Sequence, residues 1–151
     1  MDNFEKSIAF VLGAEGGYVN NPGDPGGETN YGISKRAYPR LDIKHLGISE
    51  AKEIYYHDYW LLSGCDKLAW PMCLVQFDTA VNMGVGQANH MIKQLSGPSR
   101  SQGVAAYFTI RKNYYIAVAA IGSNAQFLNG WLNRLGRLNK YIVSHKEATN
   151  G

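Results

Sequence analysis

The sequence lacks the marks of several common protein classes. It has 151 residues and only two cysteines, Cys65 and Cys73, without a CxxC pair, so we expect two free thiols and neither a disulfide framework nor a zinc site. Its apolar run at residues 8–12 is far shorter than the roughly 20 residues of a membrane-spanning helix and follows two acidic residues, so we expect neither a signal peptide nor an anchor. A formal net charge of +3 is too small to indicate dedicated nucleic-acid binding.

What the chain does contain is typical of one folded domain. Hydrophobic residues make up 45% of it and charged residues 18%, which excludes an intrinsically disordered protein, because such chains combine low hydrophobicity with high net charge. A chain of this length buries roughly 70% of its unfolded surface in one core. No internal repeat, low-complexity tract or long linker interrupts it.

Apolar residues at helical spacing predict a mainly α-helical fold. Asp2 can cap a first helix in which Phe4, Ile8, Val11 and Leu12 share one face, and the glycines that follow end it. We expect further helices over 49–60, 71–82, 87–95, 103–120 and 123–143, with Ser49 as a cap and Pro71 in a first turn.

The helix expected over 123–143 carries two more specific predictions. Ser123 and Gln126 have the spacing of a capping box, which would place the helix start at Ser123. The helix is also expected to bury an apolar seam, which consists of Phe127, Trp131, Leu135, Leu138 and Ile142.

Residues 18–34 are the exception to the helical pattern. The stretch 20–27 is too rich in turn-forming residues for a helix, whereas Thr29–Ile33 could pair as an edge strand. We therefore expect a small β-hairpin and loop region near 18–34. A loop of this length in a small domain is usually functional.

Acidic side chains are the remaining candidates for catalysis. The sequence contains no Ser-His-Asp signature, phosphate-binding loop or HExxH motif, and its four histidines lack ligand spacing, so we expect no metal and no cofactor. Asp78 lies in an apolar helical run, where we interpret it first as an internal hydrogen-bond anchor and second as a substrate contact.

The position of Glu15 suits a proton donor. Glu15 ends an apolar helix, and the two glycines that follow leave it open to a cleft. A carboxyl group beside an apolar helix face loses solvation of its charged form, which favours the protonated acid. Judged by position alone, an ordinary residue at a helix end is an equally good interpretation, although an acid there opposes the helix dipole.

Three sequence elements together resemble a known family. They are Glu15-Gly16-Gly17-Tyr18, the stretch 24–33 with the pattern DPGGxTxYGI, and the stretch 77–84. In this order they resemble glycoside hydrolase family 108, the N-acetylmuramidases found among phage endolysins and bacterial secretion-associated muramidases. The resemblance extends from about residue 4 to residue 142.

The resemblance implies a lysozyme-like, mostly helical fold. We therefore expect one compact lysozyme-like domain over 1–151, with a catalytic part over 1–95 and C-terminal helices over 100–143. These helices are similar to the predicted peptidoglycan-binding segment that follows in that family. The residues that carry this likeness are Arg111, Tyr114, Tyr115 and 127–134.

For activity, the resemblance implies hydrolysis of the β-1,4 bond between N-acetylmuramic acid and N-acetylglucosamine in bacterial peptidoglycan, with Glu15 as the general acid. Glu15, Asp24 and Thr29 also run in the same order as the acid, aspartate and threonine of phage-type lysozymes, with nearly the same spacing. Asp24 and Thr29 would position or activate a water on the opposite face of the sugar, with inversion as the expected outcome. Glu28 is the alternative second carboxylate.

Several other side chains are candidates for glycan binding. Tyr18, Tyr31 and Asn82 are expected to line the cleft, because tyrosine offers a flat apolar face and a hydroxyl, although each tyrosine could equally lie in the core. Asp78 is a further candidate if it is a substrate contact, which is its second interpretation. We interpret Trp131 as core rather than as a sugar-stacking residue, because it belongs to the apolar seam. Arg111, Arg134 and Arg137 could meet the anionic wall polymer, but we slightly favour solvated charges on a helix face.

Two other functions remain open. A lytic transglycosylase would keep the fold and the acid but form a 1,6-anhydro sugar without water. A non-enzymatic wall-binding or virion structural module would keep only a relict of the motif, and the intact Glu15, Asp24 and Thr29 argue against such decay.

The expected partner is bacterial peptidoglycan. We expect a monomer. Because no secretion signal is expected, we expect it to stay in the host cytoplasm until the membrane is permeabilised and then to act on the cell wall. The resemblance to endolysins implies a holin or an equivalent membrane-opening partner. We expect no nucleic-acid partner and no stable membrane insertion.

Overall fold

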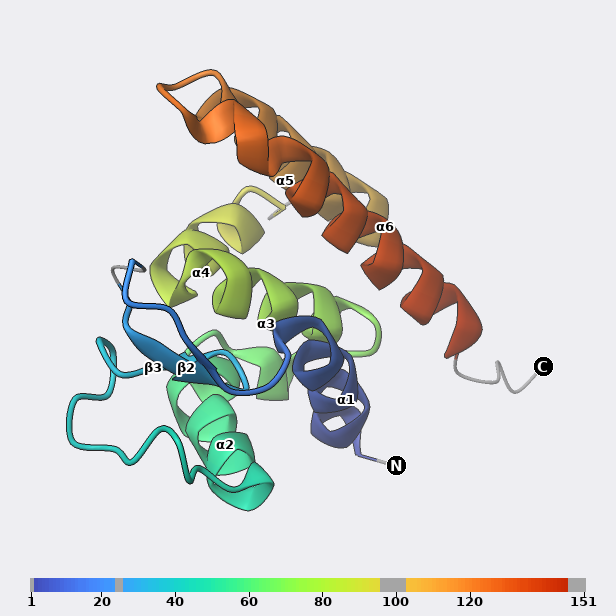
Figure 1. Ribbon diagram of the computed structural model, residues 1–151. Coiled ribbons are helices and arrows are strands. Elements are labelled where there is room, and N and C mark those ends of the chain that lie inside the picture. The colour runs from blue at the N-terminus through green and yellow to red at the C-terminus, as the bar shows by residue number, and fades with distance from the viewer. Residues whose placement is uncertain (1, 24–25, 96–102, 147–151) are drawn as a thin grey trace.

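The computed structural model describes residues 2–23, 26–95 and 103–146, which are drawn in colour in Figure 1. In these ranges the chain forms six α-helices and one small three-stranded antiparallel sheet, so the expected mainly helical fold class is confirmed. No helix in them is long and apolar enough to cross a membrane. The helices are α1 (Asn3–Glu15), α2 (Ile48–Tyr55), α3 (Met72–Met83), α4 (Val85–Lys93), α5 (Gly103–Ala119) and α6 (Leu128–Ser144), and the strands are β1 (Val19–Asn20), β2 (Glu28–Asn30) and β3 (Ile33–Ser34).

Helix α1 forms as its sequence predicts. The Asp2 side chain accepts a hydrogen bond from Phe4 N at 3.1 Å and so satisfies one of the free amides at the helix start. The expected apolar face is buried, and Val11 has no exposed surface. The helix ends at Glu15 because Gly16 adopts a φ of 76°, where a side chain would be strained.

The sheet has the strand order β1-β2-β3, with β2 in the centre. Asn30 pairs with Ile33 across β2 and β3. Tyr31 and Gly32 form the two-residue turn between these strands, and their φ values of 53° and 78° are those that a type I′ hairpin turn requires. The expected single edge strand over Thr29–Ile33 is therefore wrong, because this turn divides it into two paired strands.

Helix α3 is the centre of the molecule. Residues 73–80 are all buried, and the helix packs against α1, α4 and α5 (Figure 1). Cys73 from α3 and Cys65 from the preceding turn lie in this core as free thiols, as expected. Burial raises the pKa of the Cys73 thiol to about 11 and that of Cys65 to about 12, so neither is a nucleophile near neutral pH.

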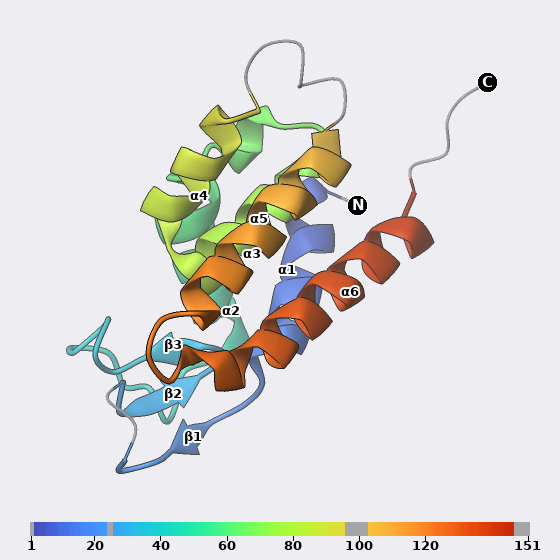
Figure 2. The ribbon, with the colours of Figure 1, turned by 90° about the horizontal axis from the view of Figure 1, so that it is seen from above.

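Helices α5 and α6 form a pair that packs against the rest of the fold through α3, α4 and α1. Figure 2 shows that the end of α5 and the start of α6 lie on the same side of the molecule as the three strands. We call this connection, with the helix ends that it joins, the α5–α6 tip (residues 114–131). The expected division into a catalytic part over 1–95 and a C-terminal segment over 100–143 stays a prediction.

Two expected helix caps are wrong. Ser123 makes no capping hydrogen bond, because residues 124–127 form a 3₁₀ segment and α6 begins only at Leu128. Phe127, expected in the buried seam, is 49% exposed as a result. Ser49 lies inside α2, where Gly47 occupies the cap position without a side-chain hydrogen bond.

Candidate active site

Glu15 lies where the end of α1 meets the β2–β3 turn. Gly32 passes so close that a Cβ atom there would lie 2.8 Å from both Cβ and Cγ of Glu15 and 2.7 Å from the Tyr55 hydroxyl. The Tyr55 hydroxyl also donates a hydrogen bond to the backbone oxygen of Tyr31. The helix end and the hairpin turn therefore fix the Glu15 side chain together, and only glycine fits at position 32.

Arg134 from α6 forms an ion pair with Glu15. Arg134 Nη1 lies 2.7 Å from Glu15 Oε1, although the two residues are 119 positions apart. The Glu15 side chain is 22% exposed and that of Arg134 only 10%. Among the described residues, none donates a hydrogen bond to the other oxygen of Glu15, Oε2. The carboxylate is thus held at one oxygen and open at the other.

Asp78 from α3 holds Arg134 from the other side. The Asp78 carboxylate has no exposed surface, and its Oδ1 lies 2.8 Å from Arg134 Nη2 and 3.1 Å from Arg134 Nε. Burial alone would lower the pKa of Arg134, but the charge and hydrogen bonds of Asp78, together with those of Glu15, outweigh burial and raise that pKa above its usual range. Arg134 therefore stays charged and anchored on Asp78.

Arg111 from α5 is the second cation on Asp78. Its Nη1 lies 3.0 Å from Asp78 Oδ2, and neither side chain has exposed surface. Its Nη2 donates a hydrogen bond of 2.8 Å to the hydroxyl of Tyr115, which in turn donates to Asn82 Oδ1. A chain of polar contacts thus runs from Asp78 to Asn82, one turn further along α3.

Glu15, Asp78, Arg111 and Arg134 form a four-charge network that joins α1, α3, α5 and α6. Two carboxylates balance two guanidinium groups, as buried charges require. The expectation of apolar surroundings for Glu15 is wrong, because α6 brings Arg134 across the end of α1. Asp78 has no surface with which to contact a glycan, so its position is that of the internal anchor.

The interpretation of Arg111 and Arg134 as solvated charges is also wrong, because both are buried. One signal for this was in the sequence. Arg134 stands three residues after Trp131 and four before Leu138, which places it on the apolar face of its helix. Asp78 in an apolar helix in turn requires a cation, although the sequence does not say which one.

The sheet carries the other expected site residues. Tyr18 is 38% exposed, and its hydroxyl donates a 2.8 Å hydrogen bond to Glu28, which raises the pKa of Tyr18. Thr29 lies in the central strand, where alternation makes it face opposite to Glu28. Tyr31 lies in the turn beside Glu15 and is partly buried against the core. Asp24 lies outside the described residues.

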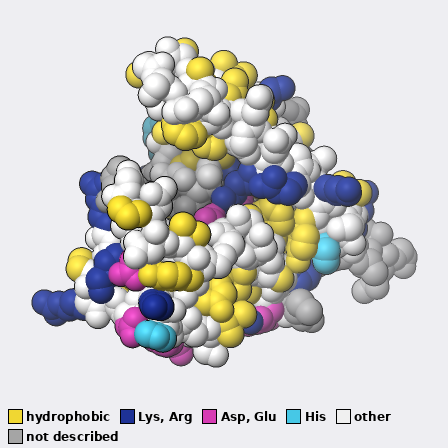
Figure 3. All heavy atoms as spheres, viewed as in Figure 1, with side chains coloured by type: hydrophobic (Ala, Val, Ile, Leu, Met, Phe, Trp, Pro, Cys, Tyr) yellow, Lys and Arg dark blue, Asp and Glu magenta, His cyan; other side chains and the backbone are white. Residues whose placement is uncertain are grey.

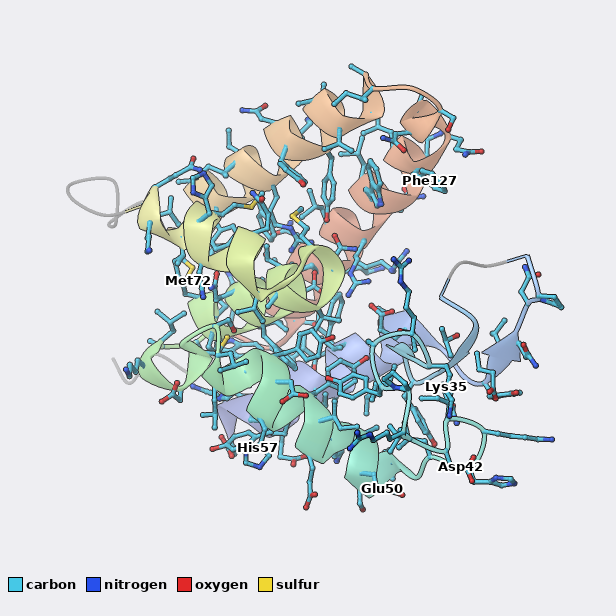
Figure 4. All side chains as sticks on the ribbon, turned by 90° about the vertical axis from the view of Figure 1, so that its left-hand side faces the viewer. Lys35, Asp42, Glu50, His57, Met72 and Phe127 are labelled. Carbon is cyan, nitrogen blue, oxygen red and sulfur yellow. The ribbon has the colours of Figure 1, made fainter. Side chains whose placement is uncertain are left out.

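The surface is hollowed between the α5–α6 tip and the part of the molecule that carries the sheet (Figure 3). Hydrophobic side chains lie above this hollow, and Lys and Arg side chains lie along its border. In Figure 4 the labelled Phe127 marks the upper side and Lys35, which follows β3, the lower side. The hollow is therefore bounded by segments that are far apart in the sequence.

Comparison with known proteins decides the family. The Glycosyl hydrolase 108 family profile matches residues 8–84, about half of the chain. The chain belongs to glycosyl hydrolase family 108. The matched range includes Glu15 and Asp78 and ends before α5 and α6, which supply the two arginines of the four-charge network. Membership of family 108 indicates a glycoside hydrolase.

A search of curated proteins finds no match. Among solved structures, that of SagA from Brucella abortus is similar, with a TM-score of 0.78 over 96% of this chain and 97% of that chain, at 24% sequence identity. The likeness shows the fold, so the expected lysozyme-like helical fold is confirmed for this family 108 chain. It spans nearly the whole chain, so α5 and α6 belong to the shared fold.

Proposed function

We propose that the protein is a peptidoglycan-degrading N-acetylmuramidase that hydrolyses the β-1,4 bond between N-acetylmuramic acid and N-acetylglucosamine. Glu15 is the general acid. The observation that carries this proposal is a partly exposed carboxylate, fixed at the end of α1 by Arg134, in a chain of family 108.

The two oxygens of Glu15 have different tasks in this proposal. Oε1 is paired with Arg134 Nη1, whereas Oε2 accepts no hydrogen bond from the described residues, so the proton for the glycosidic oxygen is carried on Oε2. As the bond breaks toward an oxocarbenium-like state, Glu15 becomes a carboxylate. Arg134 is already in place to stabilise the charge that develops on it.

Asp24 and Thr29 are the proposed residues on the opposite face of the sugar. They position or activate the water, which in an inverting enzyme requires carboxyl groups roughly 6.5–9.5 Å apart. Glu28, next to Thr29 in β2 and hydrogen-bonded to Tyr18, is the alternative second carboxylate. Tyr18, Tyr31 and Asn82 are the proposed glycan contacts.

The proposed biological role is that of an endolysin. The protein is a monomer that stays in the host cytoplasm until a holin or an equivalent partner opens the membrane, and it then lyses the cell wall. The C-terminal helices contribute to the binding of peptidoglycan.

The test compares Glu15→Gln with the unsubstituted protein on purified peptidoglycan. Glutamine keeps an oxygen acceptor for Arg134 but carries no acidic proton, so we expect a folded protein whose rate of peptidoglycan clearing falls by roughly 10²- to 10⁴-fold. Glu50→Gln, at an exposed position at the start of α2, is the matched control and should keep the full rate. An undiminished rate in folded Glu15→Gln protein would overturn the assignment of the acid.

A further inference from the structure

A pocket of about 250 Å³ lies between α3, α5 and α6. Ligand pockets for drug-sized molecules begin at roughly 300 Å³, so this one is sized for a substituent or part of one sugar ring rather than for a long chain. It is lined by Asn82, Met83, Tyr114, Tyr115, Val118 and Trp131.

Two helices place this pocket beside the four-charge network. Asn82 stands four residues after Asp78 on α3, and Trp131 stands three residues before Arg134 on α6. Residues at this spacing share one face and lie one turn apart, about 5.4 Å along the axis. Because Asp78 and Arg134 contact each other, the pocket adjoins the network from both helices, next to the residue that pairs with Glu15.

Trp131 forms an aromatic wall of the pocket. The sequence places it in the core, but it is only partly buried: its ring stacks on that of Tyr115, with centroids 5.3 Å apart and 20° between the planes, and Phe127 packs against it with centroids 5.8 Å apart. Tyr114, 37% exposed, is the third aromatic ring that lines the pocket. An exposed aromatic ring such as that of Tyr114 packs against the apolar face of a sugar.

Asn82 presents a fixed hydrogen-bond donor. Its Oδ1 accepts a hydrogen bond from the hydroxyl of Tyr115, and that hydroxyl oxygen accepts one from Arg111 Nη2. These two hydrogen bonds set the orientation of the Asn82 amide. The other end of the amide, Nδ2, donates to none of the described residues. The pocket therefore combines an oriented donor with the apolar side chains of Met83 and Val118 and with three aromatic rings.

We propose that this pocket is a subsite for the N-acetyl arm of one N-acetylhexosamine, next to the bond that Glu15 cleaves. Asn82 Nδ2 donates to the acetyl carbonyl oxygen, Met83 and Val118 contact the acetyl methyl group, and Tyr114 and the uncovered edge of Trp131 contact the sugar ring. The inference rests on the proposed function and deepens it by naming the group that the protein recognises.

The test is a calorimetric comparison of two matched glycans with the Glu15→Gln protein, which leaves both uncut. Tetra-N-acetylchitotetraose and cellotetraose share the same β-1,4 backbone and differ in carrying N-acetyl or hydroxyl groups. We expect the acetylated glycan to bind at least about tenfold more tightly, as one hydrogen bond and a buried methyl group allow. Equal affinities would overturn the inference.

Two further substitutions in the Glu15→Gln protein test which residues recognise the acetyl group. Asn82→Asp keeps an acceptor for Tyr115 but removes the donor, so the affinity ratio of the two glycans should fall toward one. Trp131→Ala should weaken the binding of both. Ile116→Ala, 47% exposed on α5 and outside the pocket, is the control and should change neither.

The outcomes separate this inference from the proposed function. Suppose that the unsubstituted protein cleaves peptidoglycan but Asn82→Asp leaves the ratio of the two glycan affinities at the parental value. In that case only the proposed subsite is overturned. Because a purely structural role of Asn82 would lower both affinities together, the ratio is the deciding readout. If the unsubstituted protein releases no glycan fragments at all, the proposed function fails as well.

Discussion

The two sides of the candidate active site are built in different ways. On the helical side, Glu15 meets a network in which Asp78 and Arg111 have no exposed surface. On the sheet side, the strands are two or three residues long and the side-chain contact between Tyr18 and Glu28 is exposed. The position of the acid is therefore set by buried charges from distant helices, and the sheet adds to it at one point, the Gly32 turn.

The largest effect is expected from a substitution in the four-charge network on the helical side. Asp78→Asn leaves the buried Arg111 without a compensating charge and leaves Arg134 with Glu15 alone, so we expect the free energy of unfolding to fall by about 3–5 kcal/mol. Urea unfolding followed by circular dichroism measures this. Asp42→Asn is the control: its side chain is 72% exposed beside His45, so this variant should unfold at the parental urea concentration. Equal losses in both variants would show that the buried network has no special weight.

A smaller effect is expected where the two sides meet. Gly32→Ala places a Cβ atom 2.8 Å from Glu15 and 2.7 Å from the Tyr55 hydroxyl, so it should lower both stability and activity. Gly64→Ala is the matched control, because Gly64 has a similar φ of 72° with no atom within 4 Å of the added Cβ. This control should lose only about 1–2 kcal/mol of stability, which is the cost of the added backbone strain, and should keep its activity per folded molecule. A parental cleavage rate in folded Gly32→Ala protein would show that the turn does not position Glu15.

The smallest effect on stability is expected on the sheet side. Tyr18→Phe removes an exposed hydrogen bond to Glu28, so the midpoint of urea unfolding should stay at the parental value. A midpoint lowered as far as that of Asp78→Asn would contradict the contrast between the two sides.

Local features of the fold could be predicted from the sequence. Asp2 and the apolar stripe through Val11 predict α1 because a cap and its helix are a few residues apart. The Ser123 cap failed although its spacing was right, because the chain first forms a 3₁₀ segment up to Phe127. Spacing alone does not decide where a helix begins when two turns compete.

The charged network could not be predicted in the same way. Asp78 and Arg134 are 56 positions apart, and Glu15 and Arg134 are 119 apart, so no local pattern links them. A buried acid indicates that a cation is near, but only the packing of α6 across α1 selects Arg134. For the same reason the sequence predicts Trp131 to lie in the core, since its helical spacing does not reveal the pocket beside it.

The most direct measurement is mass spectrometry of peptidoglycan digested in parallel by the unsubstituted protein and by Glu15→Gln. If Glu15 protonates the leaving oxygen and water completes the reaction, the unsubstituted protein releases fragments that end in reducing N-acetylmuramic acid, and the variant releases almost none. Fragments that end in a 1,6-anhydro sugar, or equal release by the variant, would contradict the account.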